Sequence, residues 1–336
     1  MKAEDINVSY EDALELAPLD LRNKIQHSVE LVRKAEKLAL IYDPENGFYN
    51  TFSGGKDSQA LYYIVKMSEV KFQTHMSLTS VDPAEVVRFV KTQYPSVIRH
   101  KPKKSIYKKA IEIGLLPTMT KRWCCKEYKE IGGAGKVKLI GIRKEESVKR
   151  SKRKEVEVSA KKFSGNIDEF KEWSNKQIER KKKRAFKNQD EFSIKNDNEV
   201  RCINGKDSII ISPLFDWTQK DVWYFLNNII KAPHCKLYDE GQTRIGCIMC
   251  PMESLKQIKK DIEKFPYVKK KWIDTIKEIR RGGRCYVYEF TNNPNATEDE
   301  IAENIFDYWI NKESYNKWYA KKFLQQKIDF DDNEKI

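Results

Sequence analysis

A short glycine-rich segment, residues 53–58 with the sequence SGGKDS, contains the residue types of a phosphate-binding loop. Two adjacent glycines let backbone N–H groups turn toward an anion without hindrance from a Cβ atom. Lys56 adds a mobile positive charge, and Asp57 is suited to hold a magnesium ion or to cap a helix. A structural turn explains the two glycines but not the whole combination. The segment therefore predicts binding of the phosphates of a nucleotide.

The residues on either side of this loop predict a strand before it and a helix after it. Residues 48–52 are aromatic and β-prone, whereas apolar residues recur at helical spacing from Asp57 to Met67. The N-terminus of such a helix carries a partial positive charge that favours a bound anion. Ser53 and Ser58 add hydroxyl donors. The spacing differs from the Walker pattern, so transfer of a γ-phosphate is not expected.

Cysteines form a second candidate site. A Cys-x-x-Cys turn places two thiols on one side of a loop, and the number and spacing of cysteines suit a metal site in a reducing compartment better than a disulfide framework. Such soft ligands predict an iron–sulfur cluster, with zinc as the alternative. The purely structural explanation is that these cysteines only pack, and we interpret Cys202 and Cys285 in that way. The candidate ligands are Cys124, Cys125, Cys235, Cys247 and Cys250.

The remaining pattern predicts an α/β fold. Strands that alternate with helices produce a parallel sheet with helices on both faces, and ligands bind beyond the carboxyl ends of its strands, where Ser53 falls. Thr218 is expected to cap a helix beginning near Gln219, with Trp217 and Trp223 in the core. The expected elements are a long helix over residues 19–42, strands over residues 71–79, 97–100, 137–142 and 209–213, and a helix that follows Pro83 and runs to Tyr94.

Composition changes along the chain suggest three parts. Residues 1–44 form an N-terminal helical segment, residues 45–252 form the nucleotide-binding domain, and residues 253–336 form a helical, aromatic C-terminal subdomain. A lysine-rich stretch over about residues 147–190 is expected to be an insertion, either partly disordered or a basic helical arm.

The overall charge favours a polyanionic partner. The chain has 64 Lys and Arg against 50 Asp and Glu, which gives a formal charge of +14. Nucleic acid is therefore an expected partner, and a solvated lysine-rich surface is the alternative. No segment approaches the roughly 20 apolar residues that span a bilayer, and the start of the chain lacks a signal-peptide core. We expect a cytoplasmic protein with no membrane contact.

These motifs resemble a known family. SGGKDS resembles the PP-loop of the ATP pyrophosphatases, which implies cleavage of ATP between its α and β phosphates. The segments TSVDP, RWCC, GIRKEES, SPLFDWTQKDVW and LYDEGQTRIGCIMCP are similar to the phosphoadenosine-phosphosulfate (PAPS) reductase family over about residues 45–255. Within it, the cysteine pattern is similar to the sulfur-inserting subunit of DNA phosphorothioation systems. The resemblance implies an adenine-nucleotide α-hydrolase-like, or Rossmann-like, fold and in many members a [4Fe-4S] cluster.

The resemblance also assigns site residues. Lys56, Asp57 and Arg143 would be catalytic, and Arg143 is suited to a bidentate phosphate contact that lysine would not reproduce. A surface ion pair with Glu145 or Glu146 is the alternative for Arg143, and Arg150 and Arg244 are further candidates of the same kind. The nucleotide-binding set is Ser53, Gly54, Gly55, Lys56, Asp57, Ser58, Asp82, Gly141 and Arg143, with Asp82 facing the ribose or a metal.

We therefore expect an ATP-dependent adenylating enzyme that acts in sulfur transfer, most simply to nucleic acid. Its cofactors would be ATP, Mg²⁺ and a [4Fe-4S] cluster, and a cysteine desulfurase or another sulfur-transfer protein would be a partner. The alternatives are a sulfonucleotide reductase and a nucleotide-sensing regulator without turnover. Sulfonucleotide reductases carry a nucleophilic cysteine in a Glu-Cys-Gly-Leu-His tail, which has no counterpart in the final QQKIDFDDNEKI.

Overall fold

The computed structural model describes residues 1–130, 132–158, 164–169, 171–173, 175–176, 179, 208–283 and 290–324. The chain forms two compact units. The first combines Met1–Ser77, Ala84–His100 and Ile131–Ile245, and the second combines Leu78–Pro83, Lys101–Glu130 and Gly246–Ile336. Each unit is therefore built from segments that are far apart in the sequence, with residues 1–44 in the first unit.

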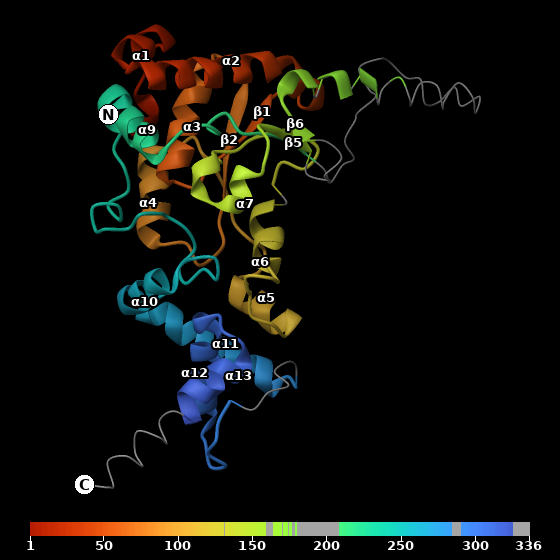
Figure 1. Ribbon diagram of the computed structural model, residues 1–336, viewed down its shortest axis with the longest axis vertical. Coiled ribbons are helices and arrows are strands. Elements are labelled where there is room, and N and C mark those ends of the chain that lie inside the picture. The colour runs from red at the N-terminus through yellow and green to blue at the C-terminus, as the bar shows by residue number, and fades with distance from the viewer. Residues whose placement is uncertain are drawn as a thin grey trace, which may run out of the picture. The chain divides into compact units, whose positions relative to one another are not determined.

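A seven-stranded sheet forms the centre of the first unit (Figure 1), in the order β3-β2-β1-β4-β7-β5-β6. The strands from β3 to β7 in this order pair in parallel, which confirms the α/β fold class. The order reverses beside β1, and ligands of such sheets bind at this switch point. The strands are β1 (Phe48–Thr51), β2 (Phe72–Ser77), β3 (Ile98–His100), β4 (Val137–Leu139), β5 (Val156–Val158), β6 (Ser164–Gly165) and β7 (Ile209–Ile211).

Two strands correct the expectation for the lysine-rich stretch. β5 pairs antiparallel with both β7 and β6, so the sheet is not wholly parallel. Val156 and Val158 are buried on either side of the half-buried Glu157, the period-two pattern of a strand. The prediction of a disordered or helical insertion over residues 147–190 is therefore wrong for this part, because strand residues lie between the lysines. Residues 180–207 lie outside the described residues.

Helices surround the sheet of the first unit. The helix α2 (Leu19–Tyr42) has the predicted bounds, and its apolar stripe packs against β1, β4 and α3. The opposite face of α2 is polar. Among the described residues, no helix is both long and apolar enough to cross a membrane. The others are η1 (Ala3–Asp5), α1 (Tyr10–Leu16), α3 (Lys56–Met67), α4 (Ala84–Gln93), η3 (Lys144–Glu146), α7 (Val148–Ser151), α9 (Gln219–Tyr224) and the π-helix η5 (Phe225–Ile230).

Polar contacts connect α2 to the segment that leads from β7 into α9. Ser28 Oγ donates to the carbonyl of Pro213 at 2.6 Å and accepts a hydrogen bond from Trp217 Nε1 at 3.0 Å. Lys24 Nζ lies 2.9 Å from Asp221 Oδ2. Trp217 is 1% exposed, which confirms its place in the core. The start of α9 is thus held in place by side chains of α2.

The N-terminus of α9 has the cap that the sequence predicted. Thr218 Oγ1 accepts a hydrogen bond from the backbone N–H of Asp221 at 3.1 Å, and the Asp221 carboxylate accepts one from Thr218 N at 2.7 Å. This reciprocal pair is a capping box, which satisfies two N–H groups that a helix start leaves without partners.

The second unit is helical, as expected for the C-terminal part. Its core includes the buried rings of Trp272, Phe306 and Trp318, and α11 contacts both α5 and α12. The helix α5 comes from the middle of the chain and was not expected. The elements are α5 (Ile106–Ile113), α6 (Trp123–Cys125), the π-helix η2 (Lys126–Glu130), α10 (Leu255–Lys264), α11 (Pro266–Arg281), α12 (Glu298–Asn311), α13 (Tyr315–Tyr319) and η6 (Ala320–Leu324).

His75 on β2 is a buried titratable group of the first unit. Its ring stacks on Tyr49 with 3.9 Å between centroids, and its Nδ1 lies 2.9 Å from His100 Nε2. Burial lowers the pKa of His75 to about 4, with the charges of His100 and Lys136 acting in the same direction and Asp43 opposing them. The folded protein therefore keeps His75 neutral under mildly acidic conditions.

We expect the free energy of unfolding to decrease as pH falls from about 6.5 to about 4. In that window the unfolded chain binds a proton at His75 and the folded chain does not, so acid favours unfolding. Urea unfolding at stepped pH values measures this effect. The His75→Gln variant should show a flatter dependence between these pH values, and curves parallel to the wild type would contradict the assignment.

Candidate functional site

The loop between β1 and α3 requires glycine at Gly54. Its φ is +76°, and a Cβ there would lie 2.8 Å from Val90 Cγ2. Two serines brace the loop internally. Ser53 N–H donates to Ser58 Oγ at 3.2 Å, and Ser58 Oγ donates to the carbonyl of Gly55 at 2.8 Å. The predicted loop residues therefore hold one another in a pre-formed turn.

The N-terminus of α3 takes a partner from a distant part of the first unit. Gly55 is the N-cap and has no side-chain oxygen to offer. The backbone N–H of Lys56 instead donates to Tyr238 Oη at 2.9 Å. Burial raises the pKa of Tyr238 well above its usual value, so the hydroxyl stays protonated. Sequence reasoning missed Tyr238, because only its place in the segment LYDEGQTRIGCIMCP linked it to the site.

Two buried cations and one carboxylate form the centre of the site. Lys56 and Arg143 are each 3% exposed. Asp57 lies between them, with Oδ2 3.0 Å from Lys56 Nζ and Oδ1 2.6 Å from Arg143 Nε. Arg143 Nη1 also lies 2.7 Å from Glu145 Oε2. The three residues predicted to be catalytic thus lie together. The alternative ion pair of Arg143 with Glu145 is also present, but the Arg143 side chain is buried and does not lie on the surface.

Gly141 allows β4 to end beside the start of α3. A Cβ at this position would lie 2.9 Å from the carbonyl oxygen of Asp57, which is too close for van der Waals contact. A residue with a side chain would therefore force the two segments apart. Because Gly141 lies two residues before Arg143, this close approach places the guanidinium within reach of the Asp57 carboxylate.

Two further arginines increase the positive charge of the site. Burial lowers the pKa of Arg150 to about 10, with the nearby charge of Arg244 acting in the same direction. Arg150 pairs with Glu146, whose Oε1 also accepts a hydrogen bond from Arg143 N at 2.9 Å. The mutual repulsion of the arginines would be relieved by a bound anion.

A cavity of about 870 Å³ opens beside these groups in the first unit. This volume lies within the range of ligand sites, which is about 300–1,000 Å³. The cavity is bordered by the loops that follow β1, β4 and β7, as expected at a switch point. Its lining residues are Lys56, Asp57, Arg143, Glu145, Glu146, Gln219, Lys220, Trp223, Tyr224, Asn227, Asn228, Thr243 and Arg244.

Asp57 fits the requirements of a magnesium ion that arrives with a nucleotide. Mg²⁺ keeps several waters and binds through one or two carboxylates plus phosphate oxygens. The side chain of Asp57 is 23% exposed, so an ion can reach it. Lys56 and Arg143 each use one of its oxygens, and every carboxylate oxygen has a second lone pair for another partner.

Asp82 belongs to the second unit. Its carboxylate accepts hydrogen bonds from Thr79 N at 2.6 Å and from Thr79 Oγ1 at 2.9 Å. Thr79 Oγ1 in turn lies 3.4 Å from Cys247 Sγ. In the structure Asp82 therefore orients a threonine beside a cysteine, and its role toward a ribose or a metal stays a prediction.

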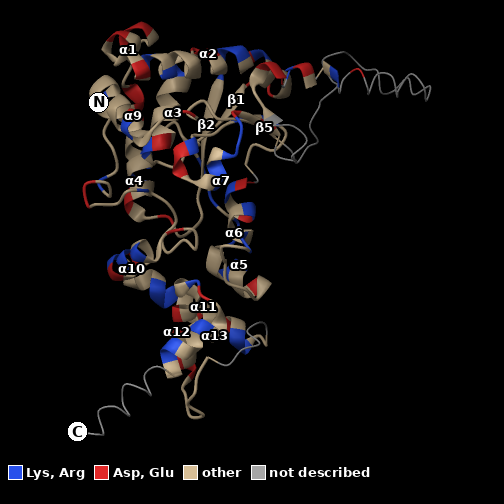
Figure 2. Cartoon of the chain, in the orientation of Figure 1, with Lys and Arg blue, Asp and Glu red and all other residues tan. Residues whose placement is uncertain are grey.

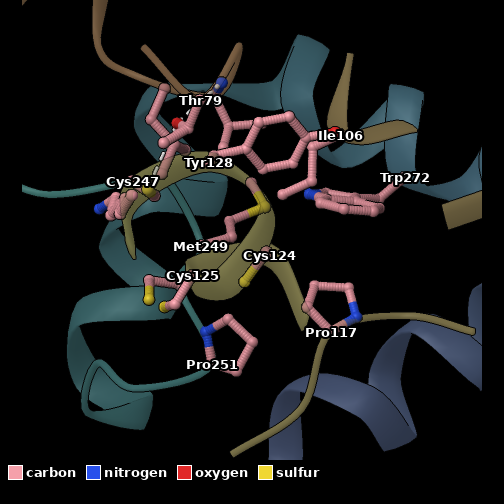
Figure 3. Close-up of a pocket in the computed structure, with 14 residues that line it drawn as sticks. Thr79, Ile106, Pro117, Cys124, Cys125, Tyr128, Cys247, Met249, Pro251 and Trp272 are labelled. Atoms are coloured by element: carbon pink, nitrogen blue, oxygen red, sulfur yellow. Dashed lines mark hydrogen bonds between the residues drawn. The ribbon is translucent and has the colours of Figure 1, made fainter. Parts of the chain in front are cut away.

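Four of the five candidate cysteines line one cavity of the second unit (Figure 3). Cys124 and Cys125 lie on α6, and Cys247 and Cys250 lie on the turn before α10. Arg122 Nη2 donates to Cys125 Sγ at 3.2 Å. The paired cysteines and the Cys-x-x-Cys turn are thus brought together, although more than 120 residues separate them in the sequence.

The surroundings of these thiols differ. A hydrogen bond from Cys124 lowers the pKa of Cys125 to about 5, with Arg122 acting in the same direction. Burial raises the pKa of Cys250. The negative charge of Cys247 raises the pKa of Lys129. The thiolate, which is the form that binds metals, is therefore favoured at Cys125, whereas the raised pKa values of Cys124 and Cys250 favour the thiol.

In the described part of the chain, no group of three or more His, Cys, Asp or Glu side chains is placed so that it could hold one metal ion. A zinc site requires such convergence. The thiolates of an iron–sulfur cluster attach to different iron atoms and need not converge on one point. A [4Fe-4S] cluster held by Cys124, Cys125, Cys247 and Cys250 stays a prediction.

The other three cysteines lie apart from this cavity or outside the described residues. Cys235 belongs to the first unit, is 1% exposed, and has its pKa raised mainly by burial. Its role as a metal ligand stays a prediction. Cys202 and Cys285 are not among the described residues.

The chain is similar to several known proteins over part of its length. An uncharacterised protein of Methanocaldococcus jannaschii is 38% identical over 73 residues, which are 22% of this chain and 15% of that protein. The FMN adenylyltransferase of Candida glabrata, solved with FAD and pyrophosphate, has a TM-score of 0.41 and 15% identity, covering 74% of this chain and 73% of that one. The PAPS reductase of Candida auris has a TM-score of 0.38 and 18% identity, covering 69% and 96%.

A family model adds the assignment that these weaker similarities do not give. The phosphoadenosine phosphosulfate reductase domain matches residues 48–253. This range includes the loop of residues 53–58, the arginines Arg143, Arg150 and Arg244, and the four cysteines of the cavity. The match covers more than half of the chain. The chain therefore belongs to the phosphoadenosine phosphosulfate reductase domain family.

Proposed function

We propose that the first unit binds ATP and cleaves it between the α and β phosphates, transferring AMP to an acceptor. The observation that carries this proposal is the group of Lys56, Asp57 and Arg143 at the N-terminus of α3. Buried cations are costly unless they are paired, and here one carboxylate pairs with both. This arrangement holds two positive charges in place for an anion.

In the proposed reaction an oxygen of the acceptor attacks the α-phosphorus, and the bond to the pyrophosphate oxygen breaks. Negative charge grows on the leaving pyrophosphate. Lys56 and Arg143 would stabilise this charge, and because they are already positioned, little reorganisation is needed. Asp57 holds both cations in their orientation. Magnesium, bound to Asp57 and phosphate oxygens, would add further positive charge.

We expect the Lys56→Ala and Asp57→Ala variants to release pyrophosphate from ATP about 10²–10³ times more slowly than the wild type, because each removes a preorganised group. Arg143→Lys should also be impaired, since lysine lacks the planar fork of arginine. The exposed neighbour Lys144, which pairs with Asp216, provides a matched control as Lys144→Ala. Unchanged release by Lys56→Ala and Asp57→Ala would refute the assignment.

Tyr238 would give way to the nucleotide. Its hydroxyl accepts the Lys56 N–H bond that a phosphate oxygen would accept at a helix N-terminus. The Tyr238→Phe variant leaves this N–H without its acceptor, which costs about 1–3 kcal/mol in a buried place. We expect lower thermal stability without ATP and an undiminished affinity for ATP, measured by calorimetry. A tenfold loss of ATP affinity would contradict this role.

We further propose that the adenylated acceptor receives sulfur, with the displacement of AMP. The four cysteines around one cavity of the second unit support this proposal. Cys124, Cys125, Cys247 and Cys250 would hold a [4Fe-4S] cluster, which when bound would relay sulfur or organise the surrounding loops. A cysteine desulfurase or another sulfur-transfer protein would supply the sulfur as a persulfide, whose outer sulfur attacks the adenylated centre as AMP leaves. A second thiol would then cleave the remaining S–S bond and form a disulfide with the carrier cysteine.

Nucleic acid is the acceptor that the charge of the chain supports best. The formal charge is +14, and Figure 2 shows Lys and Arg on the helices of both units, interspersed with Asp and Glu. The net positive charge attracts a polyanion through its phosphates. Phosphate oxygens of a nucleic acid are also oxyanions of the kind that AMP transfer activates.

Anaerobic purification should yield a brown protein that contains iron. We expect Cys124→Ser and Cys250→Ser to lose iron and visible absorption, because each removes a thiolate from the cavity. Cys235→Ser is the matched control and should keep both. A colourless wild-type protein without iron would contradict the cluster, and loss of iron in Cys235→Ser would contradict the four-cysteine set.

A further inference from the structure

One wall of the large cavity in the first unit has no part in the proposed cleavage of ATP. It consists of α9 and the π-helix η5, which continues α9 without a break. The apolar residues of η5 are buried, whereas Asn227 and Asn228 are exposed and line the cavity. Single π-helical turns are rare and frequently occur at functional sites. Here the wider turn places two adjacent amides on the same wall.

The chemistry of this wall suits a nucleotide. Tyr224 is 37% exposed and lines the cavity, so its ring is accessible for stacking. The amides of Asn227 and Asn228 carry both donors and acceptors, as the edge of a nucleobase does. Lys220, one helical turn before Tyr224, adds a positive charge for a phosphate.

The charges around the cavity favour an anionic occupant. Each carboxylate of the lining is paired with a cation of the site: Asp57 with Lys56 and Arg143, Glu145 with Arg143, and Glu146 with Arg150. Lys220 and Arg244 also border the cavity. A phosphate-bearing ligand would therefore meet positive charge without an opposing unpaired carboxylate in this lining.

A single carboxylate connects this wall to the cleavage site. Glu145 Oε2 accepts a hydrogen bond from Arg143 Nη1 at 2.7 Å and another from the backbone N–H of Gln219 at 2.6 Å. The first residue of α9 is thereby fixed to the guanidinium that would contact the pyrophosphate. A group bound to the wall would be held at a set position relative to the α-phosphorus.

We propose that the α9–η5 wall is the acceptor subsite, which binds one unstacked nucleotide of a nucleic acid. The base stacks on Tyr224, Asn227 and Asn228 contact its edge, and Lys220 contacts an adjacent phosphate. This inference rests on the proposed function, because it names the second substrate of the same cavity. The subsite leaves the loop after β1 free for ATP.

Two affinities of the full chain test this proposal. Fluorescence anisotropy gives the affinity for a short labelled single-stranded oligonucleotide, in a deoxy and a ribo form, and calorimetry gives the affinity for ATP. We expect Tyr224→Ala and the double variant Asn227→Ala with Asn228→Ala to bind the preferred oligonucleotide about tenfold more weakly, as loss of one stacked base predicts. Their affinity for ATP should not change. The exposed Tyr267 of α11 provides the control Tyr267→Ala.

Three outcomes would overturn the subsite: oligonucleotide affinity that is unchanged in both variants, ATP affinity that falls in parallel with it, or equal weakening by Tyr267→Ala. Parallel loss would assign the wall to ATP itself. Failure of the proposed cleavage is separate, since it would show as normal pyrophosphate release by Lys56→Ala. The tighter of the two oligonucleotides identifies DNA or RNA as the source of the nucleotide.

Discussion

The structure of the first unit depends on one carboxylate that pairs with two buried cations. Asp57 lies at the start of α3, Lys56 precedes it in the chain, and Arg143 comes from the end of β4. Without Asp57, two positive charges would face each other in a region of low exposure, which is strongly unfavourable. The other features of the site serve this contact: Gly141 permits the approach of strand to helix, and Glu145 extends the network to α9. The loops after β1, β4 and β7 are thereby held as one arrangement.

Local patterns in the sequence were sufficient to predict the structural features that depend on neighbouring residues in the chain. The helix over residues 19–42 has the predicted bounds because its apolar residues recur at helical spacing over several turns. The loop of residues 53–58 was recognisable because its function needs particular residue types in a row. The strands near residues 48, 72, 98, 137 and 209 were all expected, those near 137 and 209 because each is a short apolar run and the one near 48 because it is aromatic and β-prone. Arg143 was found through resemblance to a family.

Contacts between distant segments were beyond the reach of such patterns. Tyr238 lies 182 residues from the N–H group that it accepts from, and nothing in its local sequence indicates that contact. The strand β5 was missed because lysines flank it and only three residues alternate. The five cysteines were treated as one group, although four line one cavity and Cys235 belongs to the core of the first unit. Spacing along a chain does not specify which unit a residue joins.

The contacts of α2 with the start of α9 have a consequence for any shortened form of this protein. Ser28 satisfies the buried indole N–H of Trp217, and Lys24 neutralises Asp221. A fragment that lacks α2 would leave the Trp217 indole N–H without its acceptor and Asp221 without its cation, at the start of the helix that borders the large cavity. The helix α2 therefore supports α9 from outside the ligand cavity. Substitutions on the face of α2 that contacts α9 would weaken ligand binding, although these residues do not contact a ligand.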